Sequence, residues 1–420
     1  MIIARPKLAG LLTAAAVLAT SLIGCGSEPP PCGRWGTGDI TFAIGEDQSE
    51  GRQVERLVEE WERESGKQVE LVYLPATADG QRSQLAATAQ ARSPEYDVLG
   101  LDVIWTAEFA SRGYVEQLDP RFDEAALEQD FLPRPLDTAR WDDKLWAIPL
   151  NTAVGLLFYR TDKGVRAPPK DWNGLEEMAS ETPEGMSGFA GQFRPYEGLT
   201  VNVLEAIWGE GGDVLADDEA IVNQEGAEEA LARLRRGFGS KGWIDKGALN
   251  YDEQETLTAF QDERLLFMRH WPNAYVTLKA GRSRVGEKVG VAPLPGAGAL
   301  GGQNLAIAAC SNDKATALAL IEDLTDAKHQ QELFETGGYP PTRRALYEPK
   351  RYRTEDLQEL ARVVKQALDR ARLRPVRPGY PQATQIIQAI AQEVIRGDPD
   401  LTPAEAVAKL EKELEDARLD

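Results

Sequence analysis

The sequence predicts an α/β protein of two lobes, each a sheet flanked by helices, with a cleft between them. Three observations predict this class. Strand-like and helix-like patterns alternate over the first third of the chain, which is typical of a parallel sheet covered by helices on both faces. The chain has 420 residues, more than one ordinary hydrophobic core accommodates. An extended apolar segment over 145–160 is interrupted by polar groups at 151–153, and such a break suits a crossover between lobes.

The N-terminal segment has the pattern of an export signal. Arg5 and Lys7 precede an uncharged run over 8–24, and Cys25 follows directly. The run is a little short for a membrane-spanning helix, which needs roughly 20 apolar residues, and it ends in small residues. We therefore expect residues 1–24 to be a lipoprotein signal peptide and Cys25 to be acylated. A plain N-terminal membrane anchor and an ordinary cleaved signal are the alternatives.

The composition limits the partners that the mature chain could have. The formal net charge is −21, and removal of the signal takes away two positive charges. This acidity argues against nucleic acid as a partner and against a basic patch for anionic lipid. No second apolar stretch approaches the length of a membrane span. We expect residues 25–38, rich in proline and glycine, to tether a globular body to the outer face of the cell membrane through the lipid on Cys25.

Two further cysteines leave two alternatives open. Cys32 lies in the tether and Cys310 follows an apolar run. In an oxidising compartment they could form a disulfide that staples the tether to the body. Alternatively, Cys310 is a small buried side chain and Cys32 is free, because spacing alone does not show proximity.

The elements that follow the tether alternate regularly. A strand is expected over 40–44, then a helix whose apolar residues recur at i, i+3, i+4 and i+7 from Val54. A second strand over 69–73, an alanine-rich helix over 81–92 and a buried strand over 96–105 come next. Ligands of such sheets lie beyond the carboxyl ends of the strands. The loops after the first and third strands should therefore face one crevice.

The later elements complete two lobes. Further strands are expected over 289–292 and 304–308, with helices over 199–209, 227–236, 253–261 and 313–323 and again after 341. We expect residues 39–149 and about 288–336 to form the first lobe. Residues 150–287 and about 337–420 would form the second lobe.

Catalytic residues are scarce. The chain has two histidines, so a metal site with several imidazoles or a histidine-based triad is hard to build, and we expect no metal and no cofactor. His329 lies in a polar helical stretch and should be solvated, while His270 adjoins a tryptophan and could line a pocket. Residues 237–242 match a phosphate-binding loop by letter but follow a helix, so we interpret them as a helix end and turn. The many carboxylates keep a sugar hydrolase as an alternative.

Polar and aromatic residues at loops and element ends suit a neutral ligand rich in hydroxyl groups. Carboxylates accept hydroxyl hydrogen bonds, arginine donates to several oxygens, and tryptophan stacks on the C–H face of a sugar ring. The candidates are Glu46, Asp47, Asp102, Trp105, Asn151, Glu253, Glu255, Trp271, Tyr275, Tyr339 and Arg374. Of the tryptophans, Trp105 and Trp146 lie inside apolar runs and are expected in the core, whereas Trp271 precedes Pro272 in a break and could contact a ligand.

Several stretches, in this order and spacing, resemble one family. They are ADGQR at 78–82, YDV at 96–98, LDVIWTAEF at 101–109, NT at 151–152, LLFYR at 156–160, Phe260, FMRHWP at 267–272, LGGQNLAI at 300–307 and RPV at 374–376. The chain from Ile40 to about Tyr380 resembles the extracellular solute-binding proteins of carbohydrate ABC importers. Its pattern is similar to the trehalose- and maltose-type binding lipoproteins of actinobacteria.

The resemblance implies a type II periplasmic-binding-protein-like fold with crossover hinges. Such a protein closes on a sugar between its lobes and presents it to a membrane permease, without catalysis. A disaccharide such as trehalose or maltose and a monomeric protein are the expectations. By the resemblance, Asp102 would hold sugar hydroxyls from the first lobe, and Gln81 would point an amide at the cleft. Asp97 also matches the family, but its neighbour Val98 begins a strand, so Asp97 is expected to be structural.

The second lobe would contribute its own contacts by the same resemblance. Glu253 or Glu255 would be its carboxylate, Trp271 its stacking surface and Arg374 its guanidinium. Further contacts are expected near the crossovers, from Gly302, Gln303 and Tyr339.

Two departures from the family pattern leave the sugar open. Ala153 stands where relatives often carry a second asparagine, and His270 replaces an asparagine before Trp271. Both positions lie near the predicted pocket. A receptor for peptides or other polar solutes and a lipid-anchored glycoside hydrolase remain as alternatives.

Overall fold

The computed structural model describes residues 32–46, 51–216, 219–280, 283–348, 350–417 and 419. The predicted signal peptide, the acylation site Cys25 and the predicted contact Asp47 lie outside these residues. The described residues contain two larger sheets, both covered by helices, which confirms the predicted α/β class.

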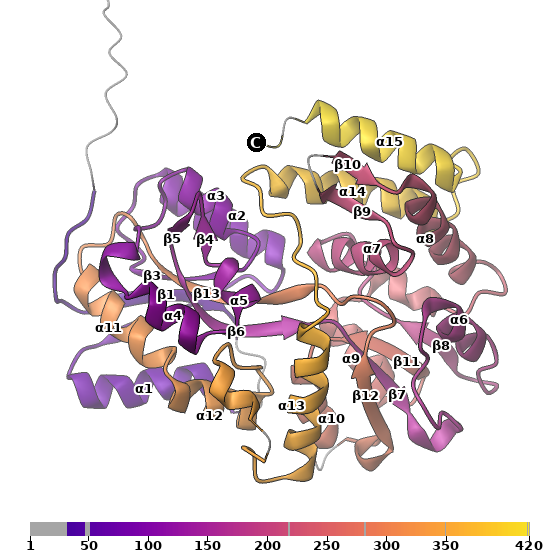
Figure 1. Cartoon of the computed structure of the whole chain (residues 1–420), viewed down its shortest axis with the longest axis horizontal. Helices are drawn as coiled ribbons and strands as arrows, with labels where there is room; N and C mark the ends of the chain where they lie inside the picture. Colours follow the sequence, from indigo (N-terminus) through magenta and orange to yellow (C-terminus); the bar gives the residue numbers. More distant parts are fainter. Residues whose placement is uncertain are drawn as a thin grey trace, which may run out of the picture. The chain divides into compact units, whose positions relative to one another are not determined.

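The first sheet has the strand order β2-β1-β3-β13-β6 (Figure 1). Its strands are β1 (Ile40–Gly45), β2 (Val69–Leu74), β3 (Val98–Asp102), β6 (Ile148–Val154) and β13 (Leu300–Ile307). β1 runs parallel to β2 and β3, as the alternating pattern predicts, whereas β13 runs antiparallel to β3 and β6. The parallel strands β1 and β3 end at the same edge, so the residues after them lie together.

The helices on the first sheet come from two distant parts of the chain. α1 (Gln53–Ser65) buries the predicted stripe that begins at Val54, and it ends at Gly66, whose φ is 68°. α11 (Lys314–Leu324) and α12 (Ala327–Gly337), orange in Figure 1, contact α1 although they follow it by some 250 residues. The remaining elements of this lobe are α2 (Ala78–Gln90), α3 (Thr106–Ser111), η1 (Asp119–Arg121), α4 (Glu124–Asp130), α5 (Pro133–Asp137), β4 (Arg140–Trp141) and β5 (Lys144–Leu145).

The second sheet has the order β12-β7-β11-β8. Its strands are β7 (Leu156–Arg160), β8 (Ser187–Ala190), β11 (Leu265–His270) and β12 (Val289–Pro293), and β7 runs antiparallel to β11 and β12. The other elements around it are η2 (Thr161–Lys163), α6 (Trp172–Ser180), α7 (Glu197–Gly209), β9 (Asp213–Ala216), β10 (Glu219–Val222), α8 (Gln224–Gly237), η3 (Lys246–Asn250), α9 (Glu253–Gln261), α10 (Asn273–Lys279), η4 (Gly286–Lys288), α13 (Glu355–Leu368), α14 (Tyr380–Ile395) and α15 (Pro403–Asp416); η5 (Arg344–Tyr347) precedes α13.

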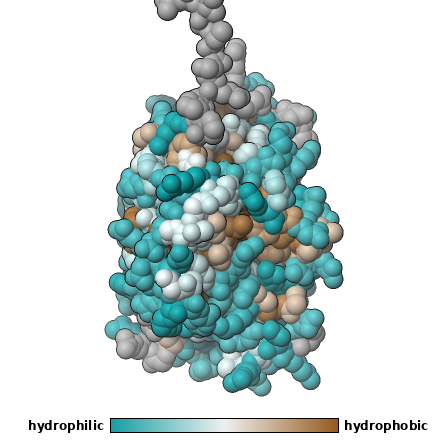
Figure 2. Space-filling view, turned by 90° about the vertical axis from the view of Figure 1, so that its left-hand side faces the viewer, coloured by the Kyte–Doolittle hydropathy of each residue, from teal (hydrophilic) through white to brown (hydrophobic). Residues whose placement is uncertain are grey.

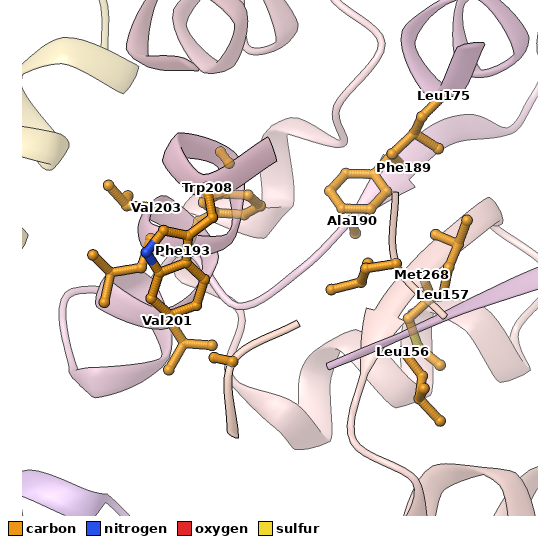
Figure 3. Close-up of a cluster of buried hydrophobic side chains, with 14 of the residues drawn as sticks. Leu156, Leu157, Leu175, Phe189, Ala190, Phe193, Val201, Val203, Trp208 and Met268 are labelled. Atoms are coloured by element: carbon orange, nitrogen blue, oxygen red, sulfur yellow. The ribbon is translucent and has the colours of Figure 1, made fainter. Parts of the chain in front are cut away.

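Each sheet has its own hydrophobic core, so the described chain has two lobes. The first core includes Phe42 and Phe109, both fully buried. The second contains Leu157, Phe189 and Met268, whose side chains lie together in Figure 3. Burial of apolar area at about 25 cal/mol per Å² is the main stabilising contribution in both cores.

Three crossovers join the lobes. Gly155 connects β6 to β7, residues 294–299 connect β12 to β13, and residues 338–354 connect α12 to α13. The amide of Gly155 donates to the carbonyl of Ala299 at 3.3 Å, which holds the first two crossovers together. The residue boundaries predicted for the lobes stay a prediction, and two details differ. Residues 151–153 remain inside β6, and β12 hydrogen-bonds to β7 of the second sheet instead of joining the first.

The chain start is tied to the first lobe. A disulfide joins Cys32 to Cys310, with the Cα atoms 4.6 Å apart. The amide of Arg34 donates to the carbonyl of Ser311 at 2.9 Å beside it. The structure therefore favours the disulfide over the alternative of a free Cys32.

Two expectations about isolated motifs have different outcomes. Residues 237–242 do form a helix end and turn: α8 is capped by Phe238, and the amide of Gly242 donates to the carbonyl of Gly239 at 3.0 Å. The prediction that His329 is solvated is wrong, since it is 4% exposed. Asp326 caps α12 through the amide of His329, which turns the imidazole Nδ1 to 2.8 Å from the carbonyl oxygen of Asp323.

Large hydrophobic side chains are rarely exposed among the described residues. The face in Figure 2 is mainly hydrophilic, and among the described residues Tyr73, 38% exposed, is the one large hydrophobic side chain open to solvent. The helices that the structure describes include none with the length and hydropathy to cross a bilayer.

Candidate functional site

A cavity of about 240 Å³ lies between residues of the two lobes. Its wall includes the carboxyl ends of β1 and β3, as the sheet topology predicts, together with residues at the start of α7, α9 and α10. The predicted contact residues that line it are Glu46, Gln81, Asp102, Asn151, Glu253, Trp271, Gly302, Gln303, Tyr339 and Arg374.

The first lobe places its polar groups at strand ends. Asp102 ends β3 and lies opposite Gln303 of β13, which in turn lies opposite Asn151 of β6. This register brings a carboxylate and two amides to one edge of the sheet. Gly302 makes the close approach possible: its φ is +124°, and a Cβ there would lie 2.4 Å from the carbonyl oxygen of Asn151.

Gln81 reaches the cavity from the first turns of α2. The side chain of Thr77 caps this helix by accepting from the amide of Gly80 at 3.3 Å. The amide of Gln81 then packs against Gly45 at the end of β1, where a Cβ would lie 2.9 Å from the Gln81 Nε2 atom.

The second lobe contributes an indole that is held at its edge. Trp271 follows β11, and its Nε1 donates to Glu253 Oε1 at 3.1 Å. The phenol of Tyr196 donates to Glu253 Oε2 at 2.6 Å. Burial, together with the neighbouring Glu253, raises the pKa of Tyr196 well above its ordinary value, so the phenol remains a donor. Glu253 thus accepts from two neutral groups and keeps its carboxylate at the cavity wall.

His270 supports Glu253 from behind. The ring is 2% exposed, and burial lowers the pKa of its imidazole, so it is neutral. Its Nε2 lies 3.0 Å from the backbone carbonyl of Glu253, which a neutral ring with its proton on Nε2 satisfies.

Arg374 connects the two lobes across the cavity. Its Nη2 donates to Asp102 Oδ1 at 2.9 Å, and its Nη1 donates to Glu197 Oε1 at 2.8 Å at the start of α7. The hydroxyls of Tyr380 and Thr384 each donate to Glu197 at 2.6 Å. Burial raises the pKa of Glu197, and Arg374 opposes that rise. Burial alone would lower the pKa of Arg374, but Asp102 and Glu197 raise it above its ordinary range.

The cavity wall is acidic. Among the described lining residues the carboxylates are Glu46, Asp102, Glu197 and Glu253, whereas Arg374 is the one cation, and it is shared by two of them. Within the described part of the chain, no group of three or more His, Cys, Asp or Glu side chains is placed to hold a metal ion.

Two predicted contacts lie elsewhere. Glu255 closes a capping box at the start of α9, where its Oε2 accepts from the amide of Asp252 at 3.0 Å, so Glu253 is the carboxylate that faces the cavity. Tyr275 is one helical turn beyond Trp271 and points into the second lobe, where it is 4% exposed and its hydroxyl donates to Asp356 at 3.3 Å.

Tyr196 and Glu197 were not predicted from the sequence. They lie just before the expected start of the helix at 199, and a charged residue in the first turn of a helix usually indicates capping. Other predictions agree with the structure: Trp105 is buried at 2%, and Asp97 is structural, since it accepts from the amide of Thr41 at 2.8 Å and from the hydroxyl of Ser311 at 2.5 Å.

Known proteins are similar to this chain in sequence and in fold. The family described as bacterial extracellular solute-binding protein matches residues 56–359. A probable ABC transporter-binding protein of Deinococcus radiodurans is 31% identical over 309 residues, which are 69% of this chain and 72% of the relative.

Two solved structures show the same architecture. The maltose-bound MalE3 of T. maritima has a TM-score of 0.83 at 30% identity, over 90% of this chain and 99% of that one. The GacH receptor of Streptomyces glaucescens, solved unliganded and in complex with acarbose, has a TM-score of 0.78 at 26% identity, over 91% and 98% of the two chains. These similarities agree with the predicted two-lobed fold.

Proposed function

Because the chain belongs to the bacterial extracellular solute-binding proteins, we propose that it is the substrate-binding protein of a carbohydrate ABC transporter. It binds a sugar in the cavity between its lobes and delivers it to the permease subunits. Membership of the family implies a place outside the cytoplasm. Closure of the lobes on the sugar is the state that the permease recognises.

The observation that carries this proposal is the composition of the cavity wall. The indole of Trp271 offers a face for the C–H groups of a pyranose ring, and Asp102 and Glu253 offer acceptors for its hydroxyls. These groups come from both lobes, and a ligand that contacts both stabilises the closed arrangement.

The size and charge of the cavity narrow the ligand class. About 240 Å³ lies just below the usual range of about 300–1,000 Å³ for small-molecule pockets, which suits a small sugar of one or two rings. A disaccharide such as maltose or trehalose is our first choice, supported by the maltose-bound and acarbose-bound relatives. The excess of carboxylates opposes anionic solutes, so a neutral sugar is favoured over acidic polar solutes.

A thermal-shift screen tests the proposal, because a ligand that binds only the folded state raises the melting temperature. The panel contains maltose, trehalose, glucose, a sugar alcohol, a uronic acid and a dipeptide, and calorimetry follows up each hit. We expect neutral sugars to stabilise the protein and the uronic acid to leave it unchanged. If the dipeptide were the one compound that stabilised the protein, the ligand would be a polar solute other than a sugar.

The alternative of a glycoside hydrolase has less support. A hydrolase needs one carboxyl group that donates a proton and a second that stays ionised. Of the carboxylates that line the cavity, Asp102 and Glu197 share the guanidinium of Arg374, and both oxygens of Glu253 accept hydrogen bonds, so these three are engaged as acceptors. Incubation with maltose for a day, followed by chromatography, should return the sugar intact. Release of glucose would favour the hydrolase.

We also propose that the protein is a monomer anchored by a lipid on Cys25. The face in Figure 2 is mainly hydrophilic, and Tyr73 is the one large hydrophobic side chain exposed among the described residues, so a lipid would supply the attachment. Fractionation of cells that produce the Cys25→Ser variant should move the protein from the membrane to the soluble fraction. A variant that stays wholly with the membrane would contradict acylation at this residue.

A further inference from the structure

A buried ion pair lies behind the cavity wall and is not explained by ligand contacts. Arg269 and Glu205 are each 1% exposed and form two parallel hydrogen bonds, from Nε at 2.8 Å and from Nη2 at 2.7 Å. The third nitrogen, Nη1, donates to Gln192 Oε1 at 3.2 Å. None of these residues lines the cavity. At a buried position, hydrophobic side chains often stabilise a protein as much as an ion pair does. Stability alone therefore does not explain why Arg269 and Glu205 are charged.

The guanidinium of Arg269 covers one face of Trp271. Its Cζ lies 3.9 Å from the ring centroid of the indole. The edge of the indole is bonded to Glu253, and the ring atoms Cζ3 and Cη2 approach Gly301, where a Cβ would lie 3.2 Å away. The indole of Trp271 is thus fixed at one face and at two edges. A ligand must contact the parts of the indole that these residues do not cover.

The same ion pair contacts two of the crossovers. Glu205 Oε1 accepts from the amide of Ala299 at 2.9 Å, and the carbonyl of Ala299 accepts from the amide of Gly155. A Cβ on Gly155 would lie 2.1 Å from Glu205 Oε1 and 2.8 Å from Arg269 Nη2. The pair therefore occupies space that the crossover leaves free because residue 155 is glycine.

We infer that Arg269 is a positioning residue for ligand binding, which holds the indole of Trp271 as a rigid wall and, through Glu205, fixes that wall to the crossovers. A side chain that is ordered before the ligand arrives loses less conformational entropy on binding, so affinity depends on its support. This inference rests on the proposed function for its affinity readout, although the order of the indole does not depend on any ligand.

The test removes both charges and keeps the shape. The double variant Glu205→Gln/Arg269→Met retains an acceptor for the amide of Ala299 and leaves no unpaired charge in the interior. It is made in the wild-type background and in the Trp271→Phe background. Calorimetry with maltose measures affinity, and near-UV circular dichroism without ligand measures the order of the indole. The difference between wild type and Trp271→Phe isolates the signal of this tryptophan.

The second lobe offers a matched control. Arg233 is 3% exposed, forms ion pairs with Glu176 at 2.5 Å and Glu210 at 2.8 Å, and lies away from the cavity. The variant Glu210→Gln/Arg233→Met removes a buried arginine and one of its carboxylate partners, whose side chain is 21% exposed. It should lose stability without changing the maltose affinity or the Trp271 signal.

We expect Glu205→Gln/Arg269→Met to weaken maltose binding about tenfold to thirtyfold and to abolish the near-UV signal of Trp271. In the Trp271→Phe background the same change should cost much less affinity, since residues that act as a unit are not additive. Arg269→Lys should keep the ion pair with Glu205 and the stability of the wild type. It should not keep the full near-UV signal of Trp271, because lysine has no planar group to stack on the indole. An unchanged signal, or an equal loss of affinity in the Arg233 control, would overturn the inference. If wild type binds no sugar of the panel, the proposed function fails, while the signal without ligand still decides the role of Arg269.

Discussion

Replacing Arg374 by methionine should make the stability of the protein depend on pH in the neutral range. Arg374 is the cation that offsets the buried charge of Glu197, which is 4% exposed. Removing one partner of a buried ion pair costs about 3–5 kcal/mol, because the other charge is left unpaired. The hydroxyls of Tyr380 and Thr384 still donate to Glu197, so we expect the lower end, about 3 kcal/mol at pH 8.

The sign of the pH dependence follows from the pKa of Glu197. Burial already raises this pKa above its ordinary value of 4.5, and Arg374 limits the rise. A carboxyl group whose pKa is raised by folding favours the native state while it is protonated, and this contribution is lost as the pH rises through its pKa in the folded protein. Without Arg374 the pKa of Glu197 rises further. The variant should therefore be destabilised little at pH 5 and fully at pH 8.

Urea denaturation at pH 5 and pH 8, followed by circular dichroism, measures the difference. The control is the double variant Glu197→Gln/Arg374→Met, in which residue 197 carries no charge at either pH. The difference in free energy of unfolding between this double variant and wild type should depend less on pH than the difference for Arg374→Met. At pH 8 the double variant should be more stable than Arg374→Met. A penalty for Arg374→Met that is the same at both pH values would refute the assignment of Glu197 as the group that Arg374 keeps charged.

Three further predictions concern affinity, backbone and covalent structure. Asp102→Asn removes a charged acceptor from the cavity and should weaken binding of a neutral sugar about tenfold to a hundredfold in calorimetry, while the fold survives because Glu197 still pairs with Arg374; an unchanged affinity would remove Asp102 from the site. Gly302→Ala introduces a Cβ at φ +124°, so we expect a loss of at least about 1–3 kcal/mol in urea denaturation, whereas Gly286→Ala, where a Cβ would meet nothing within 4 Å, should be close to neutral. Cys32→Ser, or a reductant that opens the bond to Cys310, should lower the stability by about 2–5 kcal/mol, and an equal melting temperature with and without reductant would contradict a stabilising role.

The sequence patterns predicted the early elements and the edge of the sheet where the cavity lies. The stripe from Val54 is buried in α1 because apolar residues at helical spacing must share one face. Glu46 and Asp102 reach the cavity because the parallel strands β1 and β3 end at a common edge. Both results depend on local periodicity and on the direction of the chain.

The orientation of Glu255 follows from a local pattern: Asp252 and Glu255 have the spacing of a capping box, and this box turns Glu255 away from the cavity while Glu253 faces it. Other features depend on contacts between distant parts of the chain. The burial of Glu197 requires Arg374, 177 positions later in the chain. Arg269 lies within an apolar strand, and nothing in its neighbourhood in the sequence indicates that its partner is on α7.

The Cys32–Cys310 disulfide determines where a pull on the N-terminus would act. Cys310 follows β13 of the first sheet, so any force transmitted through residues 26–31 enters the first lobe and bypasses the strand β1. In the lipid-anchored protein that we propose, those residues limit the reach of the tether to about 20 Å when fully extended. In that arrangement the anchor would hold the first lobe, and the second lobe would be connected to the anchor through the first lobe and the three crossovers.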